Sequence, residues 1–315
     1  MARYVIKRLL WLIVIIFCGA IIAYTLMYLV PGDPAKLGLS ATATKEEIAA
    51  RAHAIGTDQP FFTQLGKYLF NVFFKFDFGT SWKTDRTILE EFGERLPYTM
   101  VIGGVGILLN VIIGTLLGIL AAIHEGKWQD SLTMVLAMVL VSAPGFWIAL
   151  MAQILFCKEL RWLSPTGVNT WSWWILPTLC GSLGGIAINA RQSRSAMLEV
   201  IRADYISTAR AKGQIERKVI WKHMLPNALM PIITGVGGGL AMIIAGSPVM
   251  EQVFSIPGIG NYMLSGVNQR DRPVVVGCVI FFAAFTGVVM LLTDLAYAFL
   301  DPRIKAQYST RKRAK

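Results

Sequence analysis

Few residues of this 315-residue chain have the types and spacing that catalysis or metal binding requires. The three histidines are scattered through polar segments and the four cysteines form no CxxC pair, so neither a zinc site nor a disulfide framework is indicated. Gly-Lys pairs at 66–67 and 126–127 precede Tyr68 and Trp128 instead of Ser or Thr, so a phosphate-binding P-loop is absent. No HExxH or GxSxG motif with partners occurs. The sequence therefore offers no catalytic set for an intramembrane enzyme.

One acidic residue, Asp294, lies well inside an apolar run. An intramembrane carboxylate is a candidate for proton coupling, which would suit an ion-coupled secondary transporter. However, Asp294 lies near the end of its run, close to Asp301 and Arg303, so it also fits an interfacial acid paired with a neighbouring polar or basic group. We favour the interfacial acid and keep the secondary transporter as an alternative.

The composition of the chain indicates that most of it forms apolar helices. Hydrophobic residues make up 55% of the chain and charged residues 16%, against roughly 45–50% and about 25% in a typical globular domain. A helix needs about 20 residues to cross the hydrocarbon core, and six stretches approach or exceed that length. The sequence predicts an all-α integral membrane protein with six transmembrane helices, near residues 9–30, 97–123, 132–157, 174–190, 227–250 and 274–300.

The basic residues predict the orientation of these spans. If the N-terminus is cytoplasmic, the segments on that side (1–8, 124–130, 191–223 and 301–315) carry a net charge of +12. The segments on the other side carry a net charge of zero, and Asp294 accounts for the difference from the total of +11. Because positive charge concentrates in cytoplasmic loops, both termini are predicted to be cytoplasmic. The basicity is then a signal of topology and does not indicate a nucleic-acid partner.

The span at 174–190 is the shortest and the most interrupted, with Pro177 and three glycines inside it. Pairs of glycines four residues apart occur at 114/118, 181/185 and 235/239. Such pairs let helices pack closely in lipid, whereas proline and glycine in one short span could also give irregular backbone that faces a cavity. We favour close packing, and the second interpretation stays open.

Residues 31–96, 158–173 and 251–273 are predicted to lie outside the cytoplasm, and two of these segments carry further structural signals. Residues 31–96 are marginal for an independent hydrophobic core, so they are expected to pack on the membrane spans. Three helices are predicted in this segment, at 43–54, 61–76 and 86–95. The other segment, 251–273, contains an apolar run broken at Pro257 and Gly258, which is typical of an interfacial or re-entrant turn.

The most informative segment is the predicted cytoplasmic loop at 191–226. Met197, Ile201, Tyr205 and Ala209 have the spacing of one helical face. Gly213 follows in the position where a left-handed residue ends a helix, and a second short helix is expected over 216–225. Two interpretations stay open: the apolar face docks on a partner protein, or a basic amphipathic helix rests on the lipid headgroups.

A motif in this loop resembles a known family. Residues 207–213, Ser-Thr-Ala-Arg-Ala-Lys-Gly, followed after nine residues by His223-Met-Leu-Pro226, resemble the EAA loop of ABC importer permeases. Ala209, Gly213, Leu225 and Pro226 match that pattern. Ser207 stands where the motif has its glutamate, so no salt bridge of that glutamate can be carried over.

Further motifs resemble the dipeptide, oligopeptide and nickel permeases of this family in particular. They keep the order and spacing of that family along nearly the whole chain. They are Asp204-Tyr-Ile-Ser-Thr-Ala-Arg-Ala-Lys-Gly213, Pro31-Gly-Asp-Pro34, Asp58-Gln-Pro60, Phe78-Gly-Thr-Ser81, Glu251-x-x-Phe254-x-x-Pro257-Gly-x-Gly260 and Asp301-Pro-Arg303.

The resemblance implies a type I permease fold and a place in a larger transporter. The chain would form half of a pore with a second, homologous permease in a bacterial or archaeal cytoplasmic membrane. It would import di- or oligopeptides, with nickel or another small solute as the alternative. A solute-binding protein would deliver the substrate outside, and two ATPase subunits would bind ATP and Mg²⁺, since this chain itself binds no cofactor.

The resemblance also assigns roles to residues. The ATPase-coupling loop would use Tyr205, Ala209, Arg210, Gly213, Leu225 and Pro226. An extracytoplasmic gate would use Glu251, Phe254, Pro257, Gly258 and Gly260. The implied organisation is an N-terminus with the first helix (1–30), an extracytoplasmic region (31–96), a transmembrane permease core (97–300) with the coupling loop (191–226), and a basic cytoplasmic tail (301–315).

Overall fold

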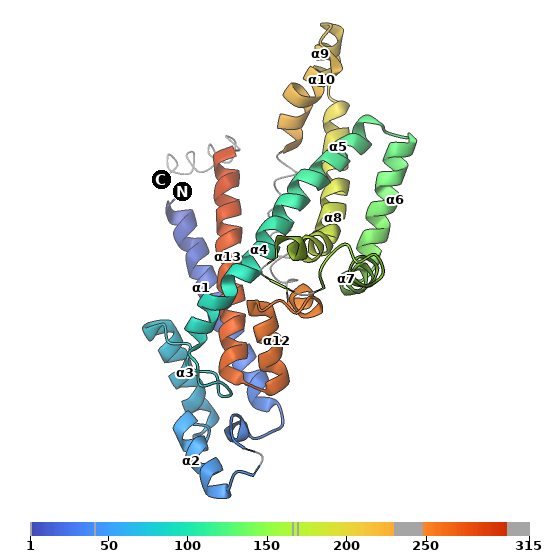
Figure 1. The fold of residues 1–315 in the computed structure, drawn as a ribbon. Helices are drawn as coiled ribbons and strands as arrows, with labels where there is room; N and C mark the ends of the chain where they lie inside the picture. The colour runs from blue at the N-terminus through green and yellow to red at the C-terminus, as the bar shows by residue number, and fades with distance from the viewer. Residues whose placement is uncertain (1, 41, 166, 169, 230–247, 301–315) are drawn as a thin grey trace, which may run out of the picture. The chain divides into compact units, whose positions relative to one another are not determined.

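The structure is a computed structural model that describes residues 2–40, 42–165, 167–168, 170–229 and 248–300. Within these ranges the chain is helical and forms no strand, and the only strand-like pairing is an isolated bridge between Thr80 and Thr87. The chain divides into two compact units. Unit 1 comprises Met100–Phe254 with the segment from Val288, and unit 2 comprises Ala2–Thr99 with Ser255–Gly287. Figure 1 gives the order of the helices.

Unit 2 contains the first membrane helix, the predicted extracytoplasmic segment 31–96 and most of the segment 251–273. Its elements are α1 (Ala2–Leu29), η1 (Pro34–Lys36), α2 (Lys45–Ile55), α3 (Phe61–Lys75), the start of α4 (Ile88–Leu109), α12 (Ile259–Gln269) and the first half of α13 (Arg272–Leu300). The three helices predicted between residues 31 and 96 are confirmed, except that the third continues without a break into the next span.

Local sequence explains where α2 begins and ends. The hydroxyl of Thr44 accepts the backbone N–H of Glu47, and the Glu47 carboxylate accepts the N–H of Thr44 at 2.7 Å, so together they form a capping box. Gly56 ends the helix at φ 73°, a left-handed conformation that favours glycine. These signals fix the helix although none of its residues is buried.

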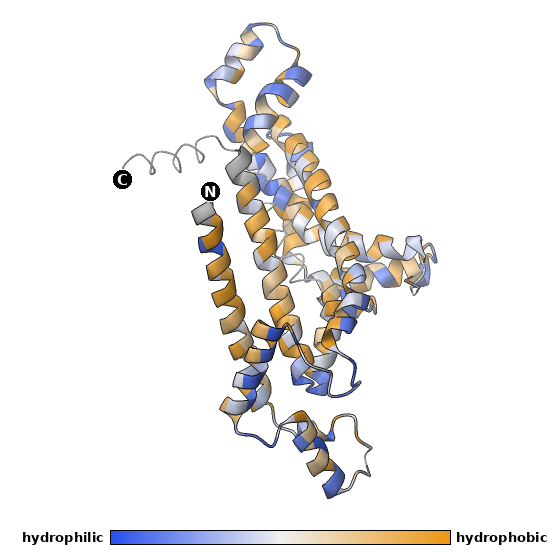
Figure 2. Cartoon of the chain, turned by 90° about the vertical axis from the view of Figure 1, so that its left-hand side faces the viewer, coloured by the Kyte–Doolittle hydropathy of each residue, from blue (hydrophilic) through white to orange (hydrophobic). Residues whose placement is uncertain are grey.

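Two apolar clusters hold unit 2 together. In the first, Tyr24 of α1 and Val72 of α3 pack with Val276 and Ile280 of α13. In the second, α4, α12 and α13 meet through a group that includes Ile88 and Tyr262. The segment at 31–96 therefore packs on membrane helices, as its short length predicts. Figure 2 shows that the helix at the N-terminus is apolar along most of its length, as a lipid-facing helix requires.

Unit 1 is built around α8 (Ile175–Ile201), which packs on α5, α6 and α7. The other elements are the end of α4, η2 (Asn110–Gly114), α5 (Thr115–Ile123), α6 (Trp128–Ser142), α7 (Gly145–Gln153), η3 (Ile154–Glu159), η4 (Trp171–Trp174), α9 (Asp204–Ala211), α10 (Glu216–Lys218) and η5 (Val219–Met224). Residues 225–229 and 248–253 are also helical.

The membrane spans match the prediction in part. Three helical stretches are long and apolar enough to cross a membrane, Val5–Leu29, Ile88–Ile123 and Arg272–Thr293, and they confirm the first, second and sixth predicted spans. The fourth, 174–190, lies inside α8, which does not pass the same test, and the fifth, 227–250, lies mostly outside the described residues. The count of six therefore stays a prediction. The side chain of Asp294 is also outside the described part.

The third predicted span, 132–157, is not one continuous helix. The helices α6 and α7 are bent by 99° where Ala143 and Pro144 separate them, so this is a broken span or a re-entrant loop. The reason is local: proline lacks a backbone N–H, and the residue before it is pushed out of the helical region. Ala143 accordingly has an extended ψ of 135°.

Close helix packing explains Gly114 at the end of η2 and Gly118 in α5. A Cβ on Gly118 would lie 2.6 Å from the Ala190 carbonyl oxygen of α8, and a Cβ on Gly114 would lie 2.9 Å from the Asn189 side chain. The alternative of irregular backbone within 174–190 is wrong. Helix α8 is unbroken there, because Pro177 lies in its first turn, where its missing N–H needs no partner.

A buried polar contact fixes the same helix pair. Asn110 begins a π-helical turn, and the side-chain amide of Asn189 donates to its carbonyl at 2.9 Å. Ser193 in turn donates to the Asn189 side-chain oxygen at 3.2 Å. Buried polar groups inside a membrane protein need such partners, so the α5–α8 pair has one preferred register.

Candidate functional site

The loop between α8 and residue 225 is the candidate functional site. Figure 1 shows α9 and α10 beyond the ends of α5 and α8, so this loop projects from unit 1. Gly213 ends the first short helix at φ 73°, and its N–H donates to the Arg210 carbonyl at 2.9 Å. The predicted left-handed end of this helix is confirmed.

The loop has a hydrophobic core of its own. Ile206 and Ala209 of α9 pack with Met197 of α8, Val219 and Met224 of η5, Ile119 and Ala122 of α5, Ala196 and Ala228. The prediction that Ala209 lies on an exposed docking face is wrong, because its exposed fraction is only 7%. The cause is a break at Ala203, whose backbone is extended. Because the helix is interrupted there, the apolar face of α8 does not continue along α9. Tyr205 consequently faces outward, and Ile206 and Ala209 face inward.

The outer surface of the loop carries large apolar side chains. Ile215 is 71% exposed, and Tyr205 and Trp221 are about half exposed. Of the other predicted residues, Leu225 packs partly against the inner cluster and Pro226 is exposed. Exposed apolar side chains on a small projection are typical of an interaction surface. Sequence reasoning missed Ile215 and Trp221, although each is an apolar residue in a charged stretch.

Polar contacts hold the loop in shape. Arg210 donates to both carboxylate oxygens of Glu216, at 2.6 and 3.2 Å. This hydrogen-bonded pairing with Arg210 holds the pKa of Glu216 below its ordinary value. His223 and Gln214 are joined at 2.7 Å between the ring nitrogen Nε2 and the amide oxygen. The two short helices are thus tied to each other and behave as one element.

Two ion pairs join the end of α8, where the loop begins, to α6 and to the turn between α5 and α6. Arg194 of α8 donates to both oxygens of Asp130 in α6, at 2.5 and 2.7 Å, and Asp130 also accepts the Gly126 N–H at 3.1 Å. Arg202 pairs with Glu125 at 2.9 Å. These partners lie far apart in the sequence, so spacing alone gives no signal for them. The sequence analysis accordingly missed them.

The predicted gate residues fall on either side of the boundary between the two units. In unit 1, Glu251 and Phe254 are buried. In unit 2, Gly258 and Gly260 are buried, and Pro257 is half-buried. The chain turns at Pro257 and Gly258, and α12 begins directly afterwards, which agrees with the predicted break in the apolar run. A gating role for these residues stays a prediction.

Comparison with known families gives two matches. The family model described as the inner membrane component of binding-protein-dependent transport systems matches residues 114–306. The model for the N-terminal part of the membrane component of such systems matches residues 1–103. The two models cover nearly the whole chain.

Individual proteins resemble the chain over its length. The dipeptide transport system permease protein DppB of Alkalihalophilus pseudofirmus is 36% identical, over 97% of this chain and all of its own length. The glutathione transport system permease protein GsiC of Salmonella paratyphi A is 35% identical, over 97% of this chain and 99% of its own length. A putative peptide transport system permease protein of Brucella abortus is 36% identical, with the same two coverages as the glutathione permease.

A solved structure resembles the fold. A chain of the MetNI methionine ABC transporter, in an inward-facing conformation, aligns with a TM-score of 0.56 at 17% identity. The alignment covers 68% of this chain and 97% of that chain. At this identity the likeness concerns the fold alone.

Proposed function

Because the chain belongs to the family of inner membrane components of binding-protein-dependent transport systems, we propose that it forms half of the pore of an ATP-driven peptide importer. The chain is a multi-pass inner-membrane permease with the ABC importer type I fold, and it is not an enzyme. In the proposed complex, a second homologous permease completes the pore. Two ATPase subunits bind ATP and Mg²⁺, and a solute-binding protein brings the substrate to the outer side.

One observation carries this proposal: the projecting loop keeps its core inside and presents large apolar side chains outside. Ile215, Tyr205 and Trp221 are exposed, although the loop already has a complete cluster around Ile206. Apolar side chains that folding does not use are available to a partner protein. We propose that an ATPase subunit covers them, so that closure of the ATPases moves the loop and rocks the permeases between two orientations.

The sharpest test compares an outer residue with an inner one. Ile215→Glu should abolish co-purification with the ATPase subunits and substrate-stimulated ATP hydrolysis, while thermal unfolding of the chain stays as in the wild type. Ala209→Glu should instead lower the unfolding temperature, because a charge buried without a partner costs several kcal/mol. If Ile215→Glu still co-purifies with the ATPase subunits and keeps substrate-stimulated ATP hydrolysis, the loop has no coupling role and is a helix on the membrane surface.

The substrate is proposed from the relatives, which are named for dipeptides, glutathione and peptides. Uptake of labelled dialanine into vesicles should require ATP and the binding protein. Competition by glutathione or Ni²⁺ would assign the alternative cargo. Uptake driven by an ion gradient without ATP would instead support a secondary transporter.

We propose that both termini and residues 191–223 are cytoplasmic, on the strength of the charge asymmetry between the loops. Single cysteines at Thr44 and Lys212, in a cysteine-free variant, should react with an impermeant reagent from opposite sides of the membrane. Reaction of both from outside would refute this orientation.

We propose that Glu251, Phe254, Pro257, Gly258 and Gly260 belong to an extracytoplasmic gate. Ser255 is an exposed residue of this segment, so a cysteine there is suited to crosslinking with the partner permease. The crosslink should stop uptake and leave binding of the solute-binding protein intact. Normal uptake in a fully crosslinked complex would remove the gate assignment.

A further inference from the structure

Unit 2 contains a cavity of about 790 Å³, lined by residues of the predicted extracytoplasmic segments and the end of α1. Its walls come from the end of α1, the segment through η1, residues 52–64, and the junction of α12 with α13. Small-molecule sites typically have volumes of about 300–1,000 Å³. The cavity therefore has room for a whole small molecule and not merely for an ion.

One wall holds a buried cation, Arg272, whose side chain is 4% exposed. The guanidinium carbon lies 4.8 Å from the ring centre of Tyr24 and 5.1 Å from those of Tyr28 and Trp82. Aromatic faces stabilise a guanidinium but do not neutralise it. Its Nη1 donates to the Tyr24 hydroxyl at 3.0 Å and to the Gln64 amide oxygen at 2.9 Å. All of these groups are uncharged.

The charge of Arg272 has no carboxylate partner in the part of the chain that the structure describes. Its Nε is buried there without a hydrogen-bond partner. The neighbouring Asp271 is engaged elsewhere, since it accepts the Ser81 hydroxyl at 2.6 Å and the N–H groups of Trp82 and Lys83 at 3.2 and 3.3 Å. A buried charge is normally paired, because burying it alone costs several kcal/mol.

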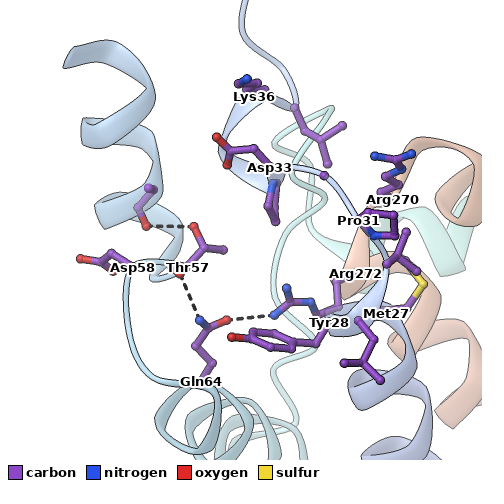
Figure 3. A pocket seen from close by; sticks show the side chains of 16 residues that line it. Met27, Tyr28, Pro31, Asp33, Lys36, Thr57, Asp58, Gln64, Arg270 and Arg272 are labelled. Atoms are coloured by element: carbon purple, nitrogen blue, oxygen red, sulfur yellow. Dashed lines mark hydrogen bonds between the residues drawn. The ribbon is translucent and has the colours of Figure 1, made fainter. Parts of the chain in front are cut away.

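The other charged residues of the cavity are distributed unevenly. Figure 3 shows Arg270 and Arg272 on one side and Asp58 on the opposite side, with Asp33 and Lys36 between them, and both of these are exposed. Arg270 is exposed and, among the described contacts, has no ion pair or hydrogen bond of its own side chain. Asp58 is joined to His53 at 2.8 Å, and this hydrogen bond lowers the pKa of the Asp58 carboxyl. The cavity thus carries charges of both signs, and its two arginines lie on the same side.

We propose that this cavity binds a small zwitterion. Its anionic group pairs with Arg272 and Arg270, and its ammonium faces Asp58. A free short peptide or amino acid has this chemistry, with a carboxylate as the anionic group. The headgroup of phosphatidylethanolamine has it too, with a phosphate. The site is an accessory to the transport path and does not depend on the cargo proposed above.

The test is calorimetric titration of the full chain, purified with its partner subunits in an uncharged maltoside detergent, with dialanine as the probe. The C-terminal amide of dialanine should bind at least about tenfold more weakly, because it leaves Arg272 unpaired. The N-acetyl derivative should lose less, about threefold, because Asp58 is exposed to solvent.

Variants assign the binding to this cavity and not to the pore. Arg272→Met should weaken dialanine binding at least about tenfold, and Arg270→Gln, which breaks no described contact, about threefold. Lys45→Gln removes an exposed charge of the same unit outside the cavity and serves as the control. If Arg272→Met fails to fold, the affinity of Arg270→Gln for dialanine still tests the proposal. Equal binding by Arg270→Gln and Lys45→Gln, or no binding at all, would overturn the proposal.

Nanodiscs separate the two sources of the zwitterion. If phosphatidylethanolamine abolishes dialanine binding and phosphatidylglycerol does not, the occupant in the cell membrane is the lipid headgroup. If dialanine binds equally in both lipids, the occupant is a soluble zwitterion.

Discussion

The ion pair between Asp130 and Arg194 is predicted to transmit force from the coupling loop to the membrane helices. Asp130 is 5% exposed and lies in the first turn of α6, whereas Arg194 lies near the cytoplasmic end of α8 as proposed. Two charge-assisted hydrogen bonds join them. Without this pair, movement of the loop would bend the end of α8 instead of moving α6 and α8 together.

The size of the effect follows from the geometry. A hydrogen bond between charged groups contributes about 1.5–3 kcal/mol, and breaking a fully buried ion pair from one side costs about 3–5 kcal/mol. The side chain of Arg194 is 26% exposed, so water screens part of the interaction. We expect a coupling energy of about 2 kcal/mol between the two residues.

A double-mutant cycle measures this quantity. Asp130→Asn and Arg194→Gln, alone and together, are compared by chemical unfolding of the purified chain and by substrate-stimulated ATP hydrolysis in the assembled complex. Each single variant should lose most of the stimulation while still assembling with the ATPases. The matched control is the exposed pair of Glu125 and Arg202, whose coupling energy should stay below about 0.5 kcal/mol. Additive effects at Asp130 and Arg194, or normal stimulation in both single variants, would refute the reasoning.

Three further predictions concern packing, the outer loops and pH. Gly118→Leu should force α5 from α8 and destabilise the chain by about 1–3 kcal/mol, whereas Gly104→Ala, with open space around it, should be neutral or stabilising in thermal unfolding. Asp271→Ala leaves the Ser81 hydroxyl and the Trp82 N–H without their acceptor, whereas the Lys83 N–H keeps its bond to the Ser81 hydroxyl, and it should cost about 2–5 kcal/mol; an unchanged unfolding temperature would contradict this. Arg210 lowers the pKa of Glu216 in the folded chain. The stability that this pair contributes is therefore present above the ordinary glutamate pKa of about 4.3, and it is lost as pH falls through the lowered pKa of Glu216 in the folded chain. Amide exchange in the loop, corrected for intrinsic rates, should therefore be constant from about pH 8 to 5, and an increase within that range would contradict the assignment to Glu216.

Local signals in the sequence predicted local structure well. The three helices between residues 31 and 96, the left-handed Gly213 and the apolar runs of the first, second and last spans depend on near neighbours in the chain, so spacing is sufficient to find them. The kink at Pro144 has an equally local cause. The long apolar run around it nevertheless predicted one helix, because hydropathy is averaged over a window that hides a single proline.

The contacts of the candidate site could not be predicted in the same way. The residue spacing predicts an outer position for Ala209 only if α8 and α9 form one continuous helix. The break at Ala203 that separates them has no proline or glycine to mark it in the sequence. Asp130 and Arg194 are charged residues in separate segments, and only the packing of α6 on α8 brings them together. Long-range pairing of this kind leaves no periodic pattern in one sequence.

The separation between the inner and outer residues of the loop has an evolutionary consequence. Ile206, Ala209 and Val219 maintain the folded shape, whereas Tyr205 and Ile215 contribute nothing to that shape and are free to recognise a partner. If an ATPase covers this loop as proposed, substitutions in the outer set can change which ATPase the permease accepts without endangering the fold. After a gene duplication, two transporters in one cell could therefore stop sharing ATPases through very few mutations, each of them tolerated on its own.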